Sequence, residues 1–536
     1  MKRLMALTLA LLMVLSLVAC GGDKPTSTPN QLSTPSNPTT STPASTNPTE
    51  PTKPADPKVE YKKEIIVTAG TAAFESVDPQ AKSSFQNTRH YQMTHERLTY
   101  LNPITSELQP MLATEWSASA DGLTWTFKLR EDVTFHNGEK FTADDVVFTW
   151  ERGKESTNSS VKSNYNMVAK CVADGDYTVK MTLETPNADF PFTRSFPYMA
   201  VLNREAVAAD AEKGVMVGTG LWKWGEHVQN DHDTFVRNDA YWGESTPTEK
   251  LTIQHIPETA SRTVAAETGE VDMAYSVSTK SLDDIRENPD LDLVEVDTIS
   301  LQYYAWNMGR QGPWQDANFR KAVAHSIDWD SVIIGWKNGF AQRATSFWSH
   351  AQYGYAPQKG YDYSVDTAKE LLAKSTYKGE DIEILAFPGW STCALIMSDM
   401  LAKVGIKSHV NDVNSATYTT LAADGEYDMT CYQFSFTAPG SDFTRFLAGS
   451  QGSRAHVGAP NAAKIDELCA KALQETDDAK RKAMYAEVQK LVEDDAVMVP
   501  ILYGKSFNAV SKGLEGIVWA PNTDNDYRYA RLPISK

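Results

Sequence analysis

The stretch between residues 110 and 148 contains the clearest fold signals in this chain. Residues 110–116 read PMLATEW, residues 121–130 read DGLTWTFKLR, residues 133–138 read VTFHNG and residues 141–148 read FTADDVVF. Residues 124–129 alternate between polar and apolar side chains, which predicts a half-buried strand. The Asp121-Gly122 pair directly before them predicts a turn.

A helix is predicted just after this strand. Thr142, with Asp145 three residues later, is typical of a helix N-cap. Strand and helix signals also alternate elsewhere: residues 62–70 predict a strand, residues 319–327 a helix, and Thr476 is predicted to cap a late helix. This interleaving predicts an α/β fold.

Length and composition limit the classes of protein to consider. The chain has 536 residues, more than one hydrophobic core usually serves, so two or three lobes are expected. Hydrophobic residues make up 41% and charged residues 22%, which is ordinary for a globular protein. The formal net charge of −18 argues against nucleic acid as a partner, because binding a polyanion depends on Lys and Arg.

The first residues are typical of an export signal. Lys2 and Arg3 precede an apolar run over residues 4–19, which is too short to favour a membrane-spanning helix. The run ends in LVACG at residues 17–21, which resembles the bacterial lipobox, in which the cysteine is acylated. We therefore expect Cys20 to carry a lipid that tethers the protein to the membrane.

A polar segment follows this cysteine. Residues 23–57 consist almost entirely of polar residues, Pro and Ala, with Leu32 as the one large aliphatic side chain. Such a segment buries too little apolar surface to offset the entropy lost on ordering. It is predicted to be a disordered linker.

Local signatures of catalysis and of metal binding are scarce. Neither a G-x-S-x-G nor an H-E-x-x-H motif occurs, and Gly504-Lys505-Ser506 lacks the earlier glycine of a phosphate loop, so it predicts a strand-end turn. The group His227, Asp231, His232 and Asp233 is interpreted as a solvated turn rather than a metal site. We expect no enzyme activity, no cofactor and no metal. The cysteines Cys171, Cys393, Cys431 and Cys469 allow three complete disulfide pairings, and buried thiols are an equal alternative.

The stretch quoted above resembles the signature of the extracellular solute-binding proteins of family 5, which serve ABC importers of peptides and nickel. Further segments resemble this family in the same order: SVDP at 76–79, HERL at 95–98, GTGLW at 218–222, GEVD at 269–272, NFRKA at 318–322 and DTAKELL at 366–372. The resemblance covers residues 62–536. It implies the type II periplasmic-binding-protein fold, with two α/β lobes around a hinged cleft and an extra inserted domain.

The resemblance also implies domain limits. We expect a signal peptide (1–19), a lipidated N-terminus (20–22), a linker (23–57), lobe I in three parts (58–106, 217–308 and 506–536), an inserted domain (107–216) and lobe II (309–505).

The ligand is less well defined than the fold. Peptide binders of this family share a W-x-x-D segment whose Asp pairs with a peptide α-ammonium. Alignment on Phe446-Leu447 places Phe436 at the Trp and Pro439 at the Asp, so the acid is missing. Asp442 is the candidate replacement, with a turn-forming role as the alternative.

Other cleft candidates follow from residue type. The aromatic candidates for stacking on a ligand are Phe434, Phe436, Trp390, Tyr303 and Trp306, each of which has core packing as its alternative. Arg445 and Arg454 are candidates for a carboxylate, and His456 for a chelated metal.

The expected function is that of a lipid-anchored, extracytoplasmic solute-binding protein that delivers oligopeptides to an ABC permease and ATPase complex. Oligosaccharides and metal chelates are the alternative ligands. A surface receptor or an enzyme with no transporter is the alternative role. We expect a monomer that contacts the cell membrane through its lipid and binds no nucleic acid.

Overall fold

The computed structural model of this chain describes residues 59–68, 70, 74–435, 455, 458–522 and 525–534. The chain divides into two units, Met1–Lys58 and Val59–Lys536, and every described residue belongs to the second. Strands and helices interleave along this unit, which confirms the predicted α/β class. Each helix in the described part of the chain is too short or too polar to span a bilayer.

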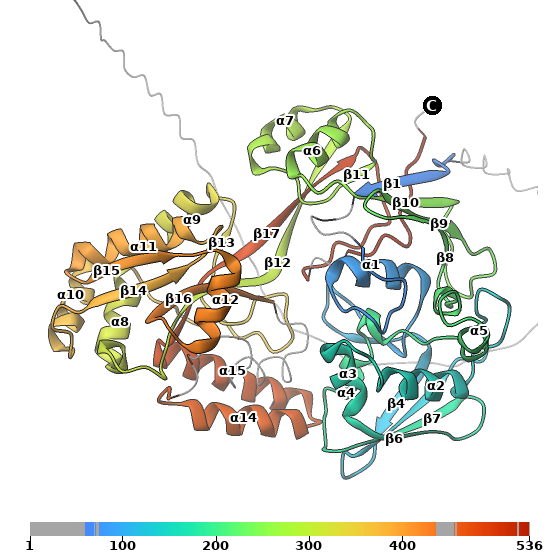
Figure 1. The fold of residues 1–536 in the computed structure, drawn as a ribbon, viewed down its shortest axis with the longest axis horizontal. Coiled ribbons are helices and arrows are strands. Elements are labelled where there is room, and N and C mark those ends of the chain that lie inside the picture. Colours follow the sequence, from blue (N-terminus) through green and yellow to red (C-terminus); the bar gives the residue numbers. More distant parts are fainter. Residues whose placement is uncertain are drawn as a thin grey trace, which may run out of the picture. The chain divides into compact units, whose positions relative to one another are not determined.

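Eleven strands of the described residues form one mixed sheet (Figure 1). Their order is β15-β14-β16-β12-β17-β11-β1-β10-β9-β8, and β13 pairs with β17 outside this path. The strands are β1 (Glu64–Thr68), β8 (Trp222–Val228), β9 (His232–Arg237), β10 (Lys250–Gln254), β11 (Met273–Ala274), β12 (Leu291–Trp306), β13 (Gln342–Arg343), β14 (Asp381–Ala386), β15 (Lys407–Asp412), β16 (Met429–Ser435) and β17 (Met498–Ser511). β1 lies inside the strand predicted at residues 62–70, and its Ile65 and Val67 are fully buried.

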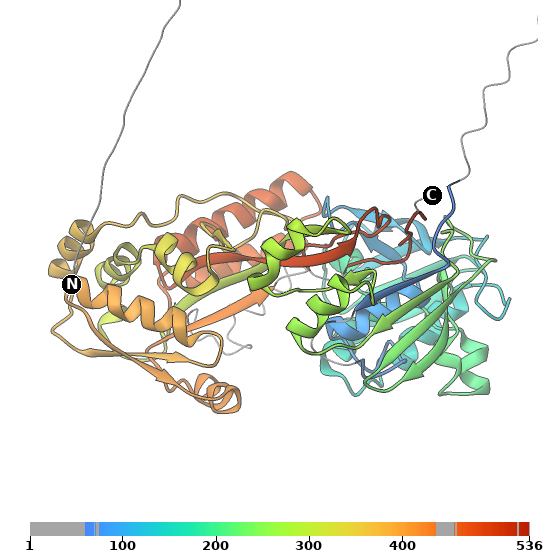
Figure 2. The same ribbon diagram turned by 90° about the horizontal axis from the view of Figure 1, so that it is seen from above.

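β12 and β17 form a long antiparallel pair in the middle of this sheet. Their register shifts between Asp297 and Leu301. β12 continues to β16 and β14, and β17 continues to β11 and β1, so the pair connects the two ends of the sheet. In Figure 2, β17 (red) runs between the blue-green and the orange parts of the chain. The turn predicted at residues 504–506 is wrong, because Lys505 and Ser506 pair with β12 and the strand continues to Ser511.

A second, four-stranded sheet lies inside residues 107–216, the range predicted for the inserted domain. Its order is β4-β5-β7-β6. The strands are β4 (Ala113–Ala118), β5 (Thr124–Leu129), β6 (Val168–Ala173) and β7 (Thr178–Leu183). β5 has the predicted bounds, and α2 (Ala143–Gly153) begins after the predicted cap, where Thr142 N donates to Asp145 Oδ2 at 2.9 Å.

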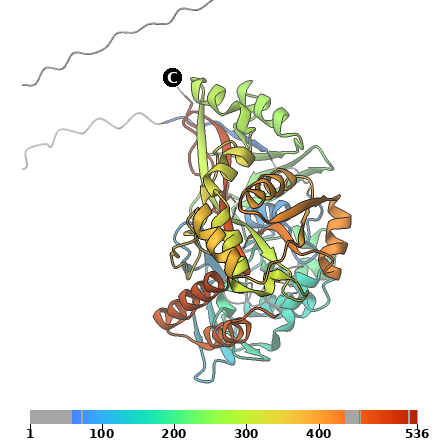
Figure 3. The ribbon, with the colours of Figure 1, turned by 90° about the vertical axis from the view of Figure 1, so that its left-hand side faces the viewer.

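Two short strands, β2 (Thr99–Leu101) and β3 (Leu108–Pro110), form a separate hairpin. Within the described residues, the remaining α-helices are α1 (Phe85–Thr94), α3 (Ser159–Asn166), α4 (Phe190–Thr193), α5 (Arg204–Ala209), α6 (Thr259–Glu267), α7 (Leu282–Glu287), α8 (Ala317–Ser326), α9 (Trp329–Lys337), α10 (Val365–Lys374), α11 (Ser391–Val404), α12 (Ser415–Asp424), α14 (Ala462–Gln474) and α15 (Asp478–Asp495). α14 and α15 lie side by side (red in Figure 3). The cap of α15 is Asp477 rather than the predicted Thr476, because the Asp477 carboxylate accepts from Lys480 N at 3.0 Å.

The glycine segment 218–220 packs against the end of α1. A Cβ atom on Gly218 would lie 2.0 Å from the carbonyl oxygen of Thr94. On the other side, Gly218 N donates to His136 Nδ1 at 3.2 Å, and His136 Nε2 donates to the Gly220 carbonyl at 3.0 Å. This pattern requires a neutral imidazole, and burial favours it by lowering the pKa of His136 to about 4.

Candidate functional site

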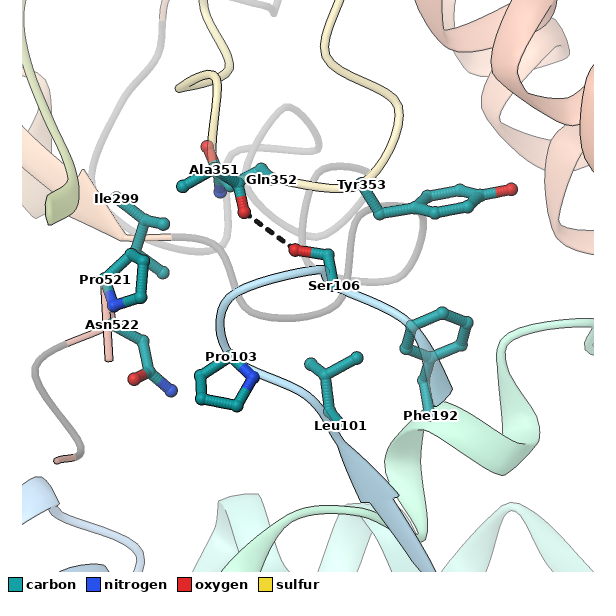
Figure 4. Close-up of a pocket in the computed structure, with 10 residues that line it drawn as sticks. All are labelled: Leu101, Pro103, Ser106, Phe192, Ile299, Ala351, Gln352, Tyr353, Pro521 and Asn522. Atoms are coloured by element: carbon teal, nitrogen blue, oxygen red, sulfur yellow. Dashed lines mark hydrogen bonds between the residues drawn. The ribbon is translucent and has the colours of Figure 1, made fainter. Parts of the chain in front are cut away.

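A pocket of about 40 Å³ lies where five distant parts of the chain meet (Figure 4). It is lined by Leu101, Pro103, Ser106, Phe192, Ile299, Ala351, Gln352, Tyr353, Pro521 and Asn522. These residues come from the ranges predicted as the two ends of lobe I, the inserted domain and lobe II, together with β12. Pockets between such parts are the usual place for a small ligand.

A larger cavity of about 800 Å³ shares Ser106, Phe192 and residues 351–353 with this pocket. It adds the β2–β3 turn and one end of α15, including Asp478, Arg481 and Lys482. We refer to the two adjoining spaces together as the junction cavity. Its walls contain aromatic rings and charges of both signs.

The β2–β3 turn is held in place from both sides. The Asn102 side-chain oxygen accepts from Ile104 N at 2.9 Å and from Thr105 N at 3.1 Å. The Ser106 hydroxyl donates to the Ala351 carbonyl at 2.8 Å, as Figure 4 shows. Ser106 has a φ of 56°, an uncommon conformation for a residue other than glycine, so the surrounding bonds must stabilise it.

Phe192 and Tyr353 form the aromatic wall of the junction cavity. Their ring centroids lie 5.8 Å apart. The Tyr353 hydroxyl donates to Asp478 Oδ1 at 2.6 Å and accepts from Arg481 Nε at 2.8 Å. Hydrogen bonds from Lys482 and Tyr353 lower the pKa of Asp478, which keeps this carboxylate ionised. The polar end of Tyr353 is therefore anchored while its ring faces Phe192.

Arg481 also reaches across to Asp189, the N-cap residue of α4, at 3.1 Å. The Asp189 side chain is fully buried and that of Arg481 is 10% exposed. Burial opposes the charge on Arg481, but the Asp189 carboxylate outweighs this effect and raises the Arg481 pKa. With Ala188 N donating to the Leu473 carbonyl at 2.6 Å, this pair attaches the start of α4 to α14 and α15.

The opposite wall belongs to the bulge in the long strand pair. Ile299 lies in the register shift of β12, and its N–H donates to the Pro521 carbonyl at 2.8 Å. This bond places Pro521 and Asn522 beside the strands that connect the two ends of the sheet.

Among the residues proposed from the sequence, three lie in the hydrophobic core. Tyr303 and Trp306 of β12 are 1% and 0% exposed, and Trp390, at the start of α11, is 6% exposed. Phe434 of β16 is half-buried against the same core. Cys20, Phe436, Pro439, Asp442, Arg445, Arg454 and His456 lie outside the described residues.

The junction-cavity residues were not among the sequence predictions. They occupy short turns and one end of a helix, and no two of the wall segments are neighbours in the sequence. Among the described lining residues, Tyr353, Asp478 and Arg481 form a polar group that a ligand could recognise, but Tyr353 and Asp478 are 125 positions apart in the sequence. No local signal was therefore available.

The interpretation of residues 227–233 as a solvated turn is wrong for one residue. Asp231 and His232 lie at the β8–β9 turn, but Asp233 is fully buried. Within the described residues, His90, Asp233 and His255 form the one group of side chains spaced to hold a metal ion. The cysteines Cys171, Cys393, Cys431 and Cys469 are all buried as thiols.

Comparison with known proteins places this chain in a family. The chain is 24% identical over 470 residues to heme-binding protein A of Haemophilus influenzae, an alignment that covers 80% of this chain and 85% of that protein. It is 24% identical over 466 residues to the dipeptide-binding protein of Escherichia coli, covering 80% and 86%. Both are named as binding proteins rather than enzymes, in agreement with the expected absence of catalysis.

The crystal structure of a dipeptide binding protein from Pseudoalteromonas, in complex with Met-Leu, has a TM-score of 0.70 to this chain. The two are 25% identical, and the match covers 88% of this chain and all of the other. The predicted fold class is thereby confirmed. A family model for bacterial extracellular solute-binding proteins, family 5, matches residues 107–454, more than half of the sequence, and the chain belongs to that family.

Proposed function

We propose that this protein is a lipid-anchored, extracytoplasmic solute-binding protein that captures oligopeptides in a closing cleft and delivers them to an ABC permease. The main support is the junction cavity, whose walls combine residues from the ranges predicted for lobe I, the inserted domain and lobe II. A ligand that contacts both walls favours the arrangement in which they are close together.

The chemistry of the cavity suits a short peptide. A zwitterionic peptide carries a cation, an anion and side chains of varied polarity, and such a ligand needs an apolar wall with a few charged groups. Phe192 and Tyr353 supply the apolar wall, and Asp478, Arg481 and Lys482 supply both signs of charge. The dipeptide-binding relatives support the same class.

The proposal assigns the peptide α-ammonium to Asp442, since Pro439 stands where peptide binders carry the acid. Asp442→Asn is expected to weaken a peptide with a free N-terminus by about 2 kcal/mol, or roughly 30-fold in affinity. The same peptide with an acetylated N-terminus should bind both proteins alike. Asp424→Asn, at an exposed residue of α12, is the matched control. Equal losses for the free and the acetylated peptide would contradict the role of Asp442.

The class of ligand is tested directly by mass spectrometry of the molecules released when the purified protein is denatured. Libraries of peptides and oligosaccharides are then offered to the emptied protein, and the retained molecules are identified. Retained and unaltered peptides are expected. Retention of sugars alone would overturn the peptide assignment, and chemical alteration of any retained molecule would overturn the assignment as a binding protein.

The tether is tested separately. Cys20→Ser is expected to move the protein from the membrane to the soluble fraction, because acyl chains contribute about 0.8 kcal/mol per buried CH₂ to membrane binding. Peptide affinity should not change, since Cys20 belongs to the unit Met1–Lys58 and the residues of the junction cavity belong to the unit Val59–Lys536. Fractionation and a peptide titration measure the two properties. A variant that stays with the membrane, or that folds but loses peptide binding, would contradict the separation of tether and cleft.

A further inference from the structure

Three histidines surround one buried carboxylate at the edge of the large sheet. Asp233 of β9 is fully buried, and its Oδ2 lies 3.0 Å from both His90 Nε2 and His255 Nε2. His90 belongs to α1, and His255 follows β10 directly. The third ring, His227 of β8, places Nδ1 2.5 Å from the other carboxylate oxygen, Oδ1. The group thus joins α1 to three neighbouring strands (Figure 1).

The hydrogen-bond partners of His90 leave its Nε2 atom without a suitable partner for the neutral ring. His90 Nδ1 lies 2.7 Å from the Gln86 carbonyl, which can only accept, so Nδ1 carries the hydrogen. In the neutral ring, Nε2 then presents a lone pair to the carboxylate oxygen of Asp233. Two lone pairs at 3.0 Å repel each other unless a proton or a metal ion lies between them.

The surroundings of Asp233 favour a cation between its carboxylate and the neighbouring imidazole rings. Within the described residues, every ion-pair partner recorded for Asp233 is a histidine, and none is Lys or Arg. A buried carboxylate without a permanent positive partner is costly. The rings of His90 and His255 are nearly parallel, at 7°, and Phe74 stacks on His90 with centroids 4.2 Å apart. The rings are therefore held in position and do not need to be ordered on binding.

We propose that His90 Nε2, His255 Nε2 and Asp233 Oδ2 bind one divalent transition-metal ion, with Zn²⁺ as the reference ion. Two imidazoles and a carboxylate are a common donor set for Zn²⁺. The three ligand atoms all lie within 4.8 Å of one another. Ligand atoms about 2 Å from a shared tetrahedral ion lie about 3.3 Å apart, so the 3.0 Å contacts need to widen by only a few tenths of an ångström.

The neighbouring contacts fit this assignment. A metal-bound histidine usually donates its other N–H to a carbonyl or carboxylate, and His90 Nδ1 does so to Gln86. His227 occupies the carboxylate oxygen that the metal does not need, and it orients Asp233. The His227 side chain is 32% exposed, whereas those of His90 and Asp233 are 1% and 0% exposed, so the ion enters from the His227 side. The bound ion ties α1 to β9 and β10.

Metal binding is measured on the full chain, produced without a histidine tag and stripped with a chelator. Zn²⁺ is titrated by calorimetry, and Co²⁺ by visible absorption, which reports the coordination geometry. One equivalent of each ion is expected, with Co²⁺ bands typical of low coordination number. The midpoint of thermal unfolding should rise by several degrees at saturating Zn²⁺, since the ion binds the folded state.

His255→Gln and His90→Gln are the test variants. A glutamine amide can still donate to Asp233, which preserves folding, but it is a poor ligand for Zn²⁺. Each variant should bind Zn²⁺ at least about 100-fold more weakly and lose the Co²⁺ bands. His232→Gln is the matched control, because His232 pairs with Asp231 beside the group without contacting Asp233. Circular dichroism verifies that each variant is folded.

Either of two results would overturn the proposal. In the first, the wild-type protein takes up neither Zn²⁺ nor Co²⁺. A proton shared with the histidines would then be the only positive charge beside the Asp233 carboxylate. In the second, both folded variants retain the wild-type affinity, so that the ion is bound elsewhere. Neither result would affect the peptide assignment, because none of the three proposed ligands lines the junction cavity.

Discussion

Gly218→Ala is expected to lower the free energy of unfolding by about 3 kcal/mol, because the new methyl group has no space. A Cβ at this position would lie 2.0 Å from the Thr94 carbonyl oxygen and 2.8 Å from two ring carbons of His95. The nearest atom belongs to the backbone at the end of α1, so no side-chain rotation relieves the clash.

Moving the two segments apart would break other contacts. The Thr94 carbonyl accepts from Gly220 N at 3.0 Å, and Gly218 N donates to His136 Nδ1. The first bond depends on the close approach of the glycine segment to α1, and the second holds the same segment against His136. The substitution therefore either strains the backbone or removes buried hydrogen bonds, and each of these is costly.

Urea unfolding followed by circular dichroism measures this effect. Gly309→Ala is the matched control: its Cβ would meet only the Asn307 side-chain oxygen, at 3.4 Å, and the residue is exposed. The control should change stability by less than about 1 kcal/mol. Similar stabilities for the two variants would show that the segment and α1 are not in the close contact described.

Arg481→Met is expected to be as damaging, with a loss of about 3 to 5 kcal/mol, because it breaks the buried ion pair with Asp189. The substitution also removes the donor that Tyr353 accepts from at 2.8 Å. Lys482→Met is the matched control on the same turn of α15. Its ammonium pairs with exposed Asp478 at 2.8 Å and lies 5.0 Å from the centre of the Tyr353 ring, and exposed contacts of this kind contribute about 1 kcal/mol or less.

A double-mutant cycle makes this prediction specific. Asp189→Asn removes the buried charge, so the double variant Asp189→Asn/Arg481→Met should be more stable than the sum of the single losses predicts, by at least about 1 kcal/mol. Additive losses would show that Arg481 stabilises the fold by packing on Phe192 and Tyr353 rather than by pairing with Asp189.

The local elements were predictable where short-range patterns decide them. Period-two alternation located β5, and the capping pair Thr142 and Asp145 located the start of α2, because both signals depend on neighbours within one or two turns of chain. The cap of α15 and the segment 504–506 were mispredicted. Adjacent residues Thr476 and Asp477 are both good caps, and the pairing of β17 with β12 overrides the turn tendency of a glycine.

The cleft was less predictable than the fold. Tyr303 and Trp306 belong to β12, which lies between β16 and β17 in the middle of the sheet, where both faces are covered. The sequence shows that such residues are aromatic but not which neighbours cover them. The walls of the junction cavity depend on contacts between distant residues such as Asp189 and Arg481, which are 292 positions apart in the sequence.

The amino-acid sequence by itself determined the α/β class, the positions of several strands and helices, and the resemblance to family 5. These properties rest on periodicity, capping and motifs that are encoded within a few tens of residues. Only the tertiary structure decided that Tyr353, Asp478 and Arg481 share a cavity, and that Asp233 lies among three histidines. The physical reason is that both groups form where strands and helices far apart in the chain pack together, and no local pattern records that packing.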